Sequence, residues 1–251
     1  MIKTTERLTT MHIYNDGTEN GMNTIFKGAN PDYRSANAII RGTLLREHKN
    51  GAENIKFNLR SFHTLSKARG KTGRHLSISS HVFTSGLSIG LICKYALEFD
   101  QKVTFEFEEL SGLKIDFDPS LSKYEPYRVG LPLKLLKIYG DNEAPAGGTV
   151  SLFNCYEDLI HSMNPISYIQ ERVDEILSEY KENSITFYAN LPIINTVGFE
   201  KDIVNYTNYT IAYIINECMK KGIHISTHHK KEGETFPWTP AVSFNNLYYP
   251  N

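Results

Sequence analysis

Long apolar runs are missing from this 251-residue chain, and so is an excess of charge of either sign. No stretch approaches the roughly 18 consecutive apolar residues that a membrane-spanning helix needs. Lysine and arginine number 27 against 28 acidic residues, so the net charge of −1 gives no general attraction to nucleic acid or to anionic membranes. We therefore expect no membrane partner.

Cysteine is scarce as well. The three cysteines, Cys93, Cys155 and Cys218, are widely separated, and neither a CxxC pair nor the ligand spacing of a metal site occurs. An odd number of isolated thiols is typical of a reducing compartment. Residues 1–17 also lack an apolar segment of signal-peptide length. These absences predict a cytoplasmic protein without a metal or a cofactor.

What the chain does contain is enough apolar sequence, 40% of all residues, for a sizeable core. Period-two alternation predicts strands at 55–61, 103–109, 113–117, 185–190 and 223–227. Helical spacing predicts a helix that Pro31 opens and helices over about 83–98, from Asn164-Pro165, and over 199–221, closed by Gly222. This order predicts an α/β fold with a mixed, partly parallel sheet flanked by helices.

The two halves of the chain share the order strand, loop, helix, strand. Residues 141–148, DNEAPAGG, are the best candidate linker, because they are polar and end in two glycines. We therefore divide the chain into residues 1–140 and 149–251, two similar βαβ-containing halves that form separate domains or one continuous domain. Residue identity between the halves is poor, which favours a shared fold class over an internal duplication.

A short basic loop precedes the predicted helix at 83–98. Its glycines are Gly70 and Gly73, and Gly70-Lys71-Thr72 resembles the end of a P-loop, but the earlier glycine that a P-loop needs is replaced by Leu65. The loop can still bind a phosphate, a nucleotide or a nucleic-acid backbone through charge and free amides, or be an ordinary solvated loop. The basic side chains are those of Lys67, Arg69, Lys71 and Arg74.

Two His-x-Ser triplets begin strand-like segments, at His75-Leu76-Ser77 and His224-Ile225-Ser226. The pair resembles the His-x-Ser/Thr motifs of two-histidine phosphoesterases. That resemblance implies that His75 and His224 act as general base and acid, while Ser77 and Ser226 hold the phosphate. Histidine suits this role because it titrates near neutrality. The sequence leaves open whether a reaction is catalysed.

Asp116-Phe117-Asp118 is the remaining pattern that could bind a metal. Two carboxylates on one strand face are the spacing of a metal-binding DxD motif. Alternation on an exposed strand produces the same pattern, so we interpret both aspartates as solvated surface residues.

Residues 75–109 read as a strand, a polar turn, an apolar helix and a second strand. Ser85-Gly86-Leu87 stands at the turn and Val103-Thr104-Phe105 in the second strand. This order resembles the central signature of STAS domains, the fold of anti-sigma-factor antagonists. The resemblance implies a regulatory protein that binds a protein partner, with Ser85 as the regulatory phosphorylation site. Thr84 replaces the family's usual acidic residue, and Thr84 or Ser85 can cap the helix.

Overall fold

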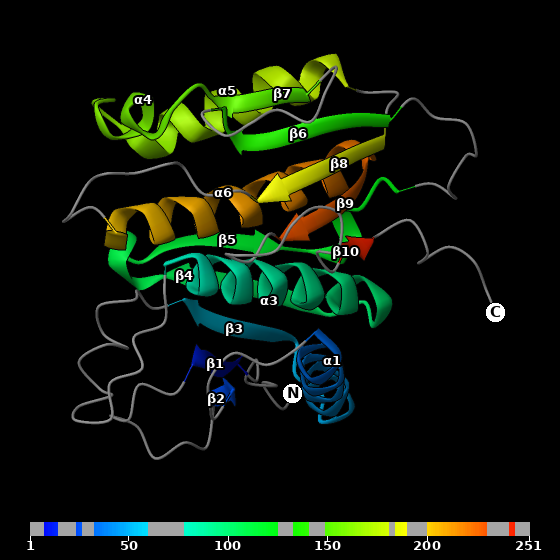
Figure 1. The fold of residues 1–251 in the computed structure, drawn as a ribbon. Coiled ribbons are helices and arrows are strands. Elements are labelled where there is room, and N and C mark those ends of the chain that lie inside the picture. The colour runs from blue at the N-terminus through cyan, green and yellow to red at the C-terminus, as the bar shows by residue number, and fades with distance from the viewer. Residues whose placement is uncertain are drawn as a thin grey trace, which may run out of the picture.

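The computed structural model describes residues 8–14, 24–26, 33–59, 78–124, 133–140, 149–180, 184–189, 200–229 and 241–243. They form two five-stranded sheets with helices between them, which confirms the predicted α/β class but with two sheets (Figure 1). None of the helices in these ranges is long and apolar enough to cross a membrane.

The first sheet is built from the N-terminal half of the chain. Its spatial order is β2 (Thr24–Phe26), β1 (Leu8–Tyr14), β3 (Asn54–Leu59), β4 (Lys102–Phe107) and β5 (Leu113–Phe117). The second sheet has the order β10 (Ala241–Ser243), β9 (His224–His229), β8 (Ser184–Ala189), β6 (Leu133–Tyr139) and β7 (Thr149–Phe153). Only β5 and β10 are antiparallel to their neighbours.

The two sheets have the same topology. In each half the first strand lies between the second and third, the fourth follows in parallel, and the fifth closes the edge in the antiparallel direction. Even the register agrees, since Tyr14 stands opposite Phe26 and Tyr139 opposite Phe153. A shared fold class does not require the same order, direction and register. The likeness between the halves is therefore greater than the sequence analysis allowed.

The division between the halves falls earlier than the predicted linker. The chain changes sheet between Phe117 and Leu133, because β6 pairs with β7 and β8. Residues 133–139 therefore belong to the second half, and the boundary placed at 141–148 is corrected. Polar, glycine-rich sequence is as typical of a connection between two strands as of a linker between domains, and here it lies between β6 and β7.

The helices begin and end where local signals act. They are α1 (Tyr33–Lys49), α3 (Ile78–Glu98), the short α4 (Tyr156–Ile160), α5 (Pro165–Glu179) and α6 (Glu200–Lys221). The side chain of Asn164 accepts a hydrogen bond from the Ser167 amide at 3.2 Å and caps α5. Gly222 ends α6 with a φ of 72°. The Asn164 start and the Gly222 end are both confirmed.

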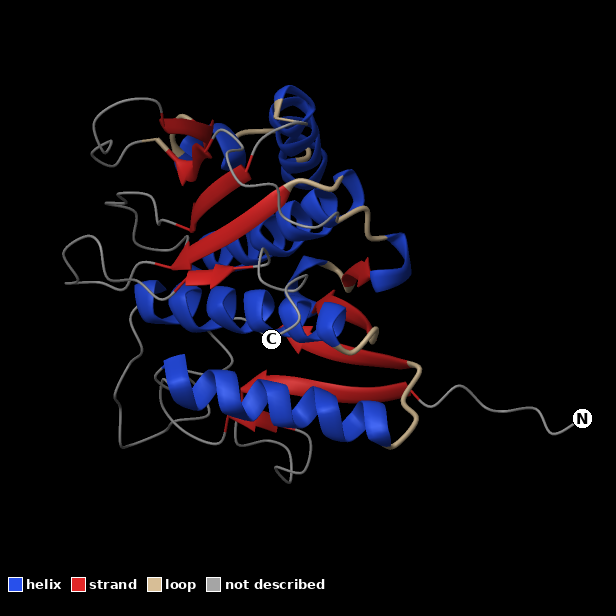
Figure 2. Ribbon diagram, turned by 90° about the vertical axis from the view of Figure 1, so that its right-hand side faces the viewer, coloured by secondary structure: helices blue, strands red, loops and turns tan. Residues whose placement is uncertain are grey.

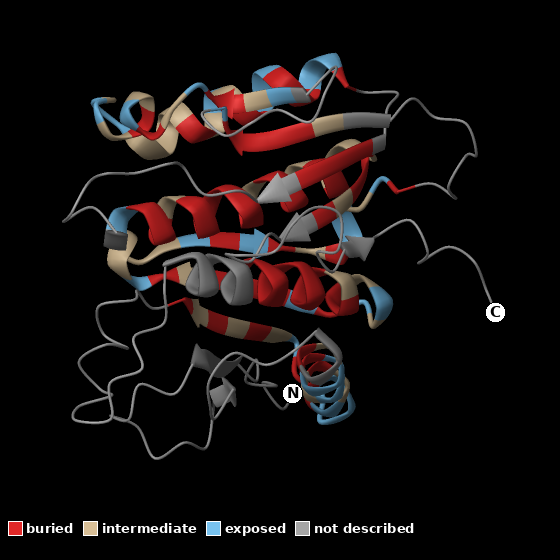
Figure 3. Ribbon diagram, viewed as in Figure 1, coloured by how far each residue is buried: buried red, intermediate tan, exposed pale blue. Residues whose placement is uncertain are grey.

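Helices α3 and α6 lie side by side at the centre of the molecule. Each contacts both sheets, because α3 also meets β8, β9 and β10 while α6 also meets β4 and β5. The first sheet lies behind α3 and the second in front of α6 in Figure 1, and the side view agrees (Figure 2). Residues 86–93 of α3 are all buried (Figure 3), since a helix between two sheets must be apolar on every side. One hydrophobic core joins the halves.

Candidate functional site

The strands of both sheets begin at the same side of the molecule. Chain after β5 contacts the end of α6, where the Lys123 amide donates to the Met219 carbonyl at 3.0 Å. The Tyr124 ring then stacks on His224, the first residue of β9, with centroids 5.4 Å apart. Since β5 ends beside the start of β4, the amino edges of the two sheets meet here. Their carboxyl edges therefore both lie at the opposite side.

Leu59 and Ile78, the described residues on either side of the basic loop, lie at that carboxyl edge. The connection 60–77 leaves the carboxyl end of β3 and enters the N-terminus of α3, and its partner in the second half, 190–199, joins β8 to α6. In open α/β sheets, ligands bind outside the carboxyl ends of the strands, and helix N-termini there favour anions. Both connections lie outside the described residues, as do the predicted binding side chains of Lys67, Arg69, Lys71, Arg74 and Ser77.

Helix α3 begins earlier than the sequence pattern indicated. Residues 78–85, expected as the end of a strand and a polar turn, are helical, so Thr84 and Ser85 stand in the second turn of α3. The predicted helix start and the capping role of Thr84 or Ser85 are therefore wrong. The side chains of both residues lie outside the description, so the regulatory role of Ser85 stays a prediction. The serines at the true start are Ser79 and Ser80, separated from Ser77 by Ile78.

A tyrosine cluster that the sequence analysis missed lies at the carboxyl end of β6. The hydroxyl oxygens of Tyr139 and Thr207 of α6 are 3.1 Å apart. The Tyr156 ring meets the Tyr139 ring edge-on, with centroids 6.1 Å apart. Burial, with the nearby Tyr139 and Asp202, raises the pKa of Tyr156 far above its usual value, so this phenol stays protonated.

The buried polar atoms that lack a hydrogen-bond partner among the described residues include the Tyr156 hydroxyl and Asn205 Nδ2. Native proteins pair nearly all such groups, so both mark a place where further polar contacts belong. The available signal was the run Asn205 to Thr210, where polar residues interrupt an apolar helix. In the structure Thr207 and Tyr209 of this run are core residues, 0% and 1% exposed.

His224 lies at the opposite side of the molecule from Leu59 and Ile78, the described ends of the connection that carries the basic loop. It is 4% exposed and starts β9 at the amino edge, and Ser226 follows it on the same strand face. His75 and Ser77 lie outside the described residues, but the connection that carries them has both of its described ends, Leu59 and Ile78, at the carboxyl edge. The geometry therefore gives the paired-histidine site no support.

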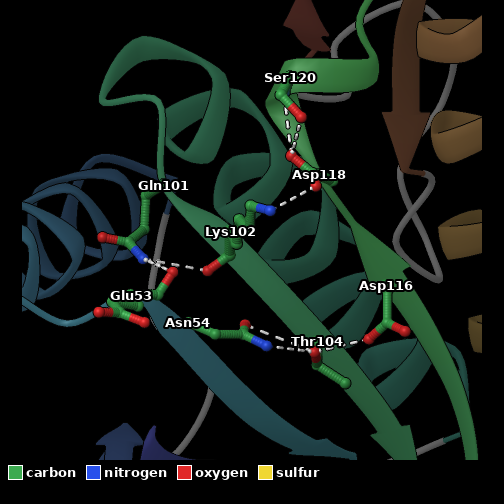
Figure 4. A network of polar contacts seen from close by, with 8 residues as sticks. All are labelled: Glu53, Asn54, Gln101, Lys102, Thr104, Asp116, Asp118 and Ser120. Carbon is green, nitrogen blue, oxygen red and sulfur yellow. Dashed lines mark hydrogen bonds and ion pairs between the residues drawn. The ribbon is translucent and has the colours of Figure 1, made fainter. Parts of the chain in front are cut away.

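Asp116 and Asp118 are held by neighbouring side chains (Figure 4). Asp116 accepts a hydrogen bond from the Thr104 hydroxyl at 2.7 Å, and Thr104 in turn accepts one from Asn54 Nδ2 at 2.9 Å. Asp118 pairs with Lys102 Nζ at 2.8 Å and accepts two hydrogen bonds from Ser120. Asp116 thus links β5 to β4 and β3, and Asp118 links the chain after β5 to β4. No group of three possible metal ligands occurs in the described part of the chain.

Comparisons of this chain with protein-family models, with curated proteins and with solved structures give no match. The resemblance of residues 75–105 to STAS domains and that of the two His-x-Ser triplets to phosphoesterases remain expectations. Function has to be inferred from the geometry of the chain itself.

Proposed function

We propose that the protein binds a phosphate-containing ligand at the β3–α3 connection. The observation that carries this proposal is the position of the connection, between the carboxyl end of a parallel strand and the N-terminus of a helix of 21 residues. Free amides and the positive end of the helix dipole favour a phosphate at such a point. The four basic residues between Lys67 and Arg74 supply the charge that a phosphate requires.

Binding rather than hydrolysis is proposed. His224, the second histidine that catalysis would need, is buried against Tyr124 at the amino edge, so no pair of general acid and base is supported. The N-termini of α3 and α6 lie on the same side of the molecule. This arrangement favours a ligand that is larger than a single phosphate group. A nucleotide and a nucleic-acid backbone both have this chemistry.

The test compares two triple variants of equal charge. Arg69→Ala, Lys71→Ala and Arg74→Ala together remove three of the four positive charges between Lys67 and Arg74, while Lys94→Ala, Lys123→Ala and Lys220→Ala remove the same charge near the amino edge. Inorganic phosphate, ATP and short single-stranded RNA and DNA are titrated by calorimetry at several salt concentrations. We expect the loop variant to bind at least about tenfold more weakly and with a shallower salt dependence, while the control binds like the wild type.

The probes separate the sources of the phosphate. A nucleotide site binds ATP more tightly than the oligonucleotides at equal phosphate concentration, whereas a nucleic-acid surface gains affinity with length. Wild-type affinity in the loop variant, or no binding by any probe, contradicts the proposal.

The second candidate is the regulatory, partner-binding role that the STAS resemblance implies. Its support is the parallel β3–α3–β4 unit, of which α3 and most of β4 lie in the segment that carries the resemblance. A phosphorylation switch at Ser85 requires that a charge there leave the fold intact, although Gly86 and Leu87 beside it are buried. Thermal unfolding of Ser85→Glu against Ser85→Ala decides this. An unfolded glutamate variant beside a folded alanine variant rules the switch out.

A cytoplasmic location is proposed as well. The thiols of Cys93, Cys155 and Cys218 are all free, which suits a reducing compartment.

A further inference from the structure

The two outermost helices, α1 and α5, lie at opposite ends of the molecule. They occupy equivalent positions in the two halves, because α1 joins the second strand to the third in the first half and α5 does so in the second. Helix α1 packs beside α3, and α5 beside α6. Each therefore turns one side to the core and the other to solvent, and exposed residues appear on both helices (Figure 3).

The solvent face of α1 is basic. Among its charged side chains Arg41 and Arg46 are 49% and 63% exposed, although Arg41 pairs with Glu98 at 2.8 Å and Arg46 with Glu47, the single acid of the helix, at 3.0 Å. An exposed apolar side chain, Ile39 at 41%, lies two turns before Arg46 on the same stripe of the helix. The basic residues of the helix are Arg34, Arg41, Arg46 and Lys49, which give it a formal net charge of +3.

The solvent face of α5 is acidic. Its acids are exposed at positions 171, 174, 175 and 179, and Arg172 is the only basic residue of the helix. Asp174 pairs with Lys221, and Glu175 with Arg172, whereas no ion pair of Glu171 or Glu179 occurs within the described part of the chain. The acids Glu171, Asp174, Glu175 and Glu179 give the helix a formal net charge of −3, equal and opposite to that of α1.

We propose that α1 of one copy docks on α5 of the next, so that copies of this chain associate head to tail. The two faces are complementary in charge, while contacts of α1 with α1 or α5 with α5 repel, so only the heterologous pairing is favoured. Because each copy keeps one free face of each kind, a head-to-tail contact can extend to further copies. This surface lies away from the carboxyl edge and does not depend on the phosphate site.

A second copy fits these faces better than a nucleic acid does. A polyanion contacts only the basic face of α1 and is repelled by the acidic face of α5. A second copy of the chain contacts both faces at once. Exposed ion pairs are individually weak and are screened at high salt. The association is therefore expected to be reversible, dependent on protein concentration and lost at high ionic strength.

The experiment measures the weight-average mass of the full chain by sedimentation at low, physiological and about 0.5 M salt, where the Debye length falls well below 10 Å. We expect a mass above that of the 28.6 kDa monomer at low salt, rising with concentration, and the monomer mass at high salt. A monomer at low salt at every concentration overturns the proposal, and so does binding of RNA by α1 without self-association.

Charge reversal on one face at a time supplies the decisive variants. Arg46→Glu with Lys49→Glu makes α1 acidic, and Glu171→Lys with Glu179→Lys makes α5 basic. Each variant alone carries two like-charged faces, so we expect it to be a monomer at low salt. An equal mixture of the two variants, or one chain with all four substitutions, restores opposite faces and should regain the wild-type mass.

Restoration separates the proposed contact from damage to the fold, because a misfolded variant cannot regain association by mixing. Association that survives either reversal, or that the mixture and the fourfold variant both fail to restore, contradicts the proposal.

Discussion

The ring of Phe107, at the end of β4, meets the ring of Tyr209 in α6 edge-on, with centroids 5.3 Å apart and an interplanar angle of 73°. Phe107 belongs to the first sheet and Tyr209 to the second half of the chain. Both side chains are buried, 2% and 1% exposed. This contact links the halves at the level of single side chains, because the helix of one half packs against the strands of the other.

Tyr209→Ala is therefore expected to destabilise both halves together. Removing a buried aromatic side chain costs about 3–5 kcal/mol of unfolding free energy. Denaturant unfolding followed by circular dichroism and by fluorescence of Trp238 should show one shared transition at a lower midpoint. Tyr209→Phe is the control, because it keeps the ring and loses only the hydrogen bond from Gln170 Nε2 at 2.8 Å, about 1 kcal/mol. Two separate transitions in Tyr209→Ala contradict the coupling.

Gly222 offers a matched pair with Gly51. Both have a positive φ, 72° and 74°, so alanine at either position incurs a similar backbone cost of about 1 kcal/mol. A Cβ at Gly222 also comes within 2.6 Å of the Lys123 carbonyl oxygen, whereas nothing lies within 4 Å at Gly51. We expect Gly222→Ala to lower the unfolding free energy by at least about 1 kcal/mol more than Gly51→Ala. If chemical denaturation shows equal losses of unfolding free energy for Gly222→Ala and Gly51→Ala, the contact with the Lys123 carbonyl oxygen is relieved by a local shift without cost.

Stability should depend on pH through Asp118. Burial raises the pKa of this carboxyl, but the hydrogen bonds and charge of Lys102 together with the hydrogen bonds of Ser120 outweigh burial and lower it. A folded pKa below the unfolded value of about 3.9 stabilises the fold above that pH, and this contribution is lost as the pH falls through the folded pKa.

Urea unfolding of the wild type and of Asp118→Asn from pH 7 to pH 2 measures this contribution. The wild type should be more stable at pH 7 by up to about 1 kcal/mol, as expected for an exposed pair, and the difference should shrink below about pH 4. Ser120→Ala removes one of the hydrogen-bonding partners and should give a smaller difference with the same sign. If the difference in unfolding free energy between the wild type and Asp118→Asn does not change with pH, ionised Asp118 does not stabilise the fold.

The three thiols should differ in reactivity. Burial raises the pKa of Cys93 and Cys218 strongly, and both side chains are 0% exposed. Cys155 is half-buried. The Asp158 amide lowers its pKa, but burial and the Asp158 carboxylate together outweigh this and raise it.

An aromatic disulfide reagent at about pH 8 should therefore modify one thiol of the folded protein, and all three in denaturant. The single reaction should accelerate as the pH rises, because thiolate is the reactive form. Cys155→Ser should abolish it while leaving the two slow thiols. Rapid modification of two or three thiols without denaturant contradicts the assignment.

Local sequence signals located several elements correctly. Asn164 before Pro165, and Gly222 after Lys221, determine helix ends through side-chain and backbone chemistry within a few residues. The apolar sequence of α3 agrees with its position between the two sheets, where residues 86–93 are all buried. The start of α3 was missed because alternation in residues 75–83 is compatible with a strand, and packing at the centre of the molecule overrides that weak preference.

By itself, then, the sequence determined the α/β class, the positions of β3, β4, β5, β8 and β9 and of most of the helices, and the basic character of the β3–α3 connection, because these depend on local periodicity and composition. Only the tertiary structure decided that the strands form two sheets of one topology, that the division falls between Phe117 and Leu133, and that His224 lies at the amino edge. These features depend on which strands pair across more than forty residues, as Asn54 with Lys102 does. Such pairing is decided by burial of the whole core rather than by any short segment.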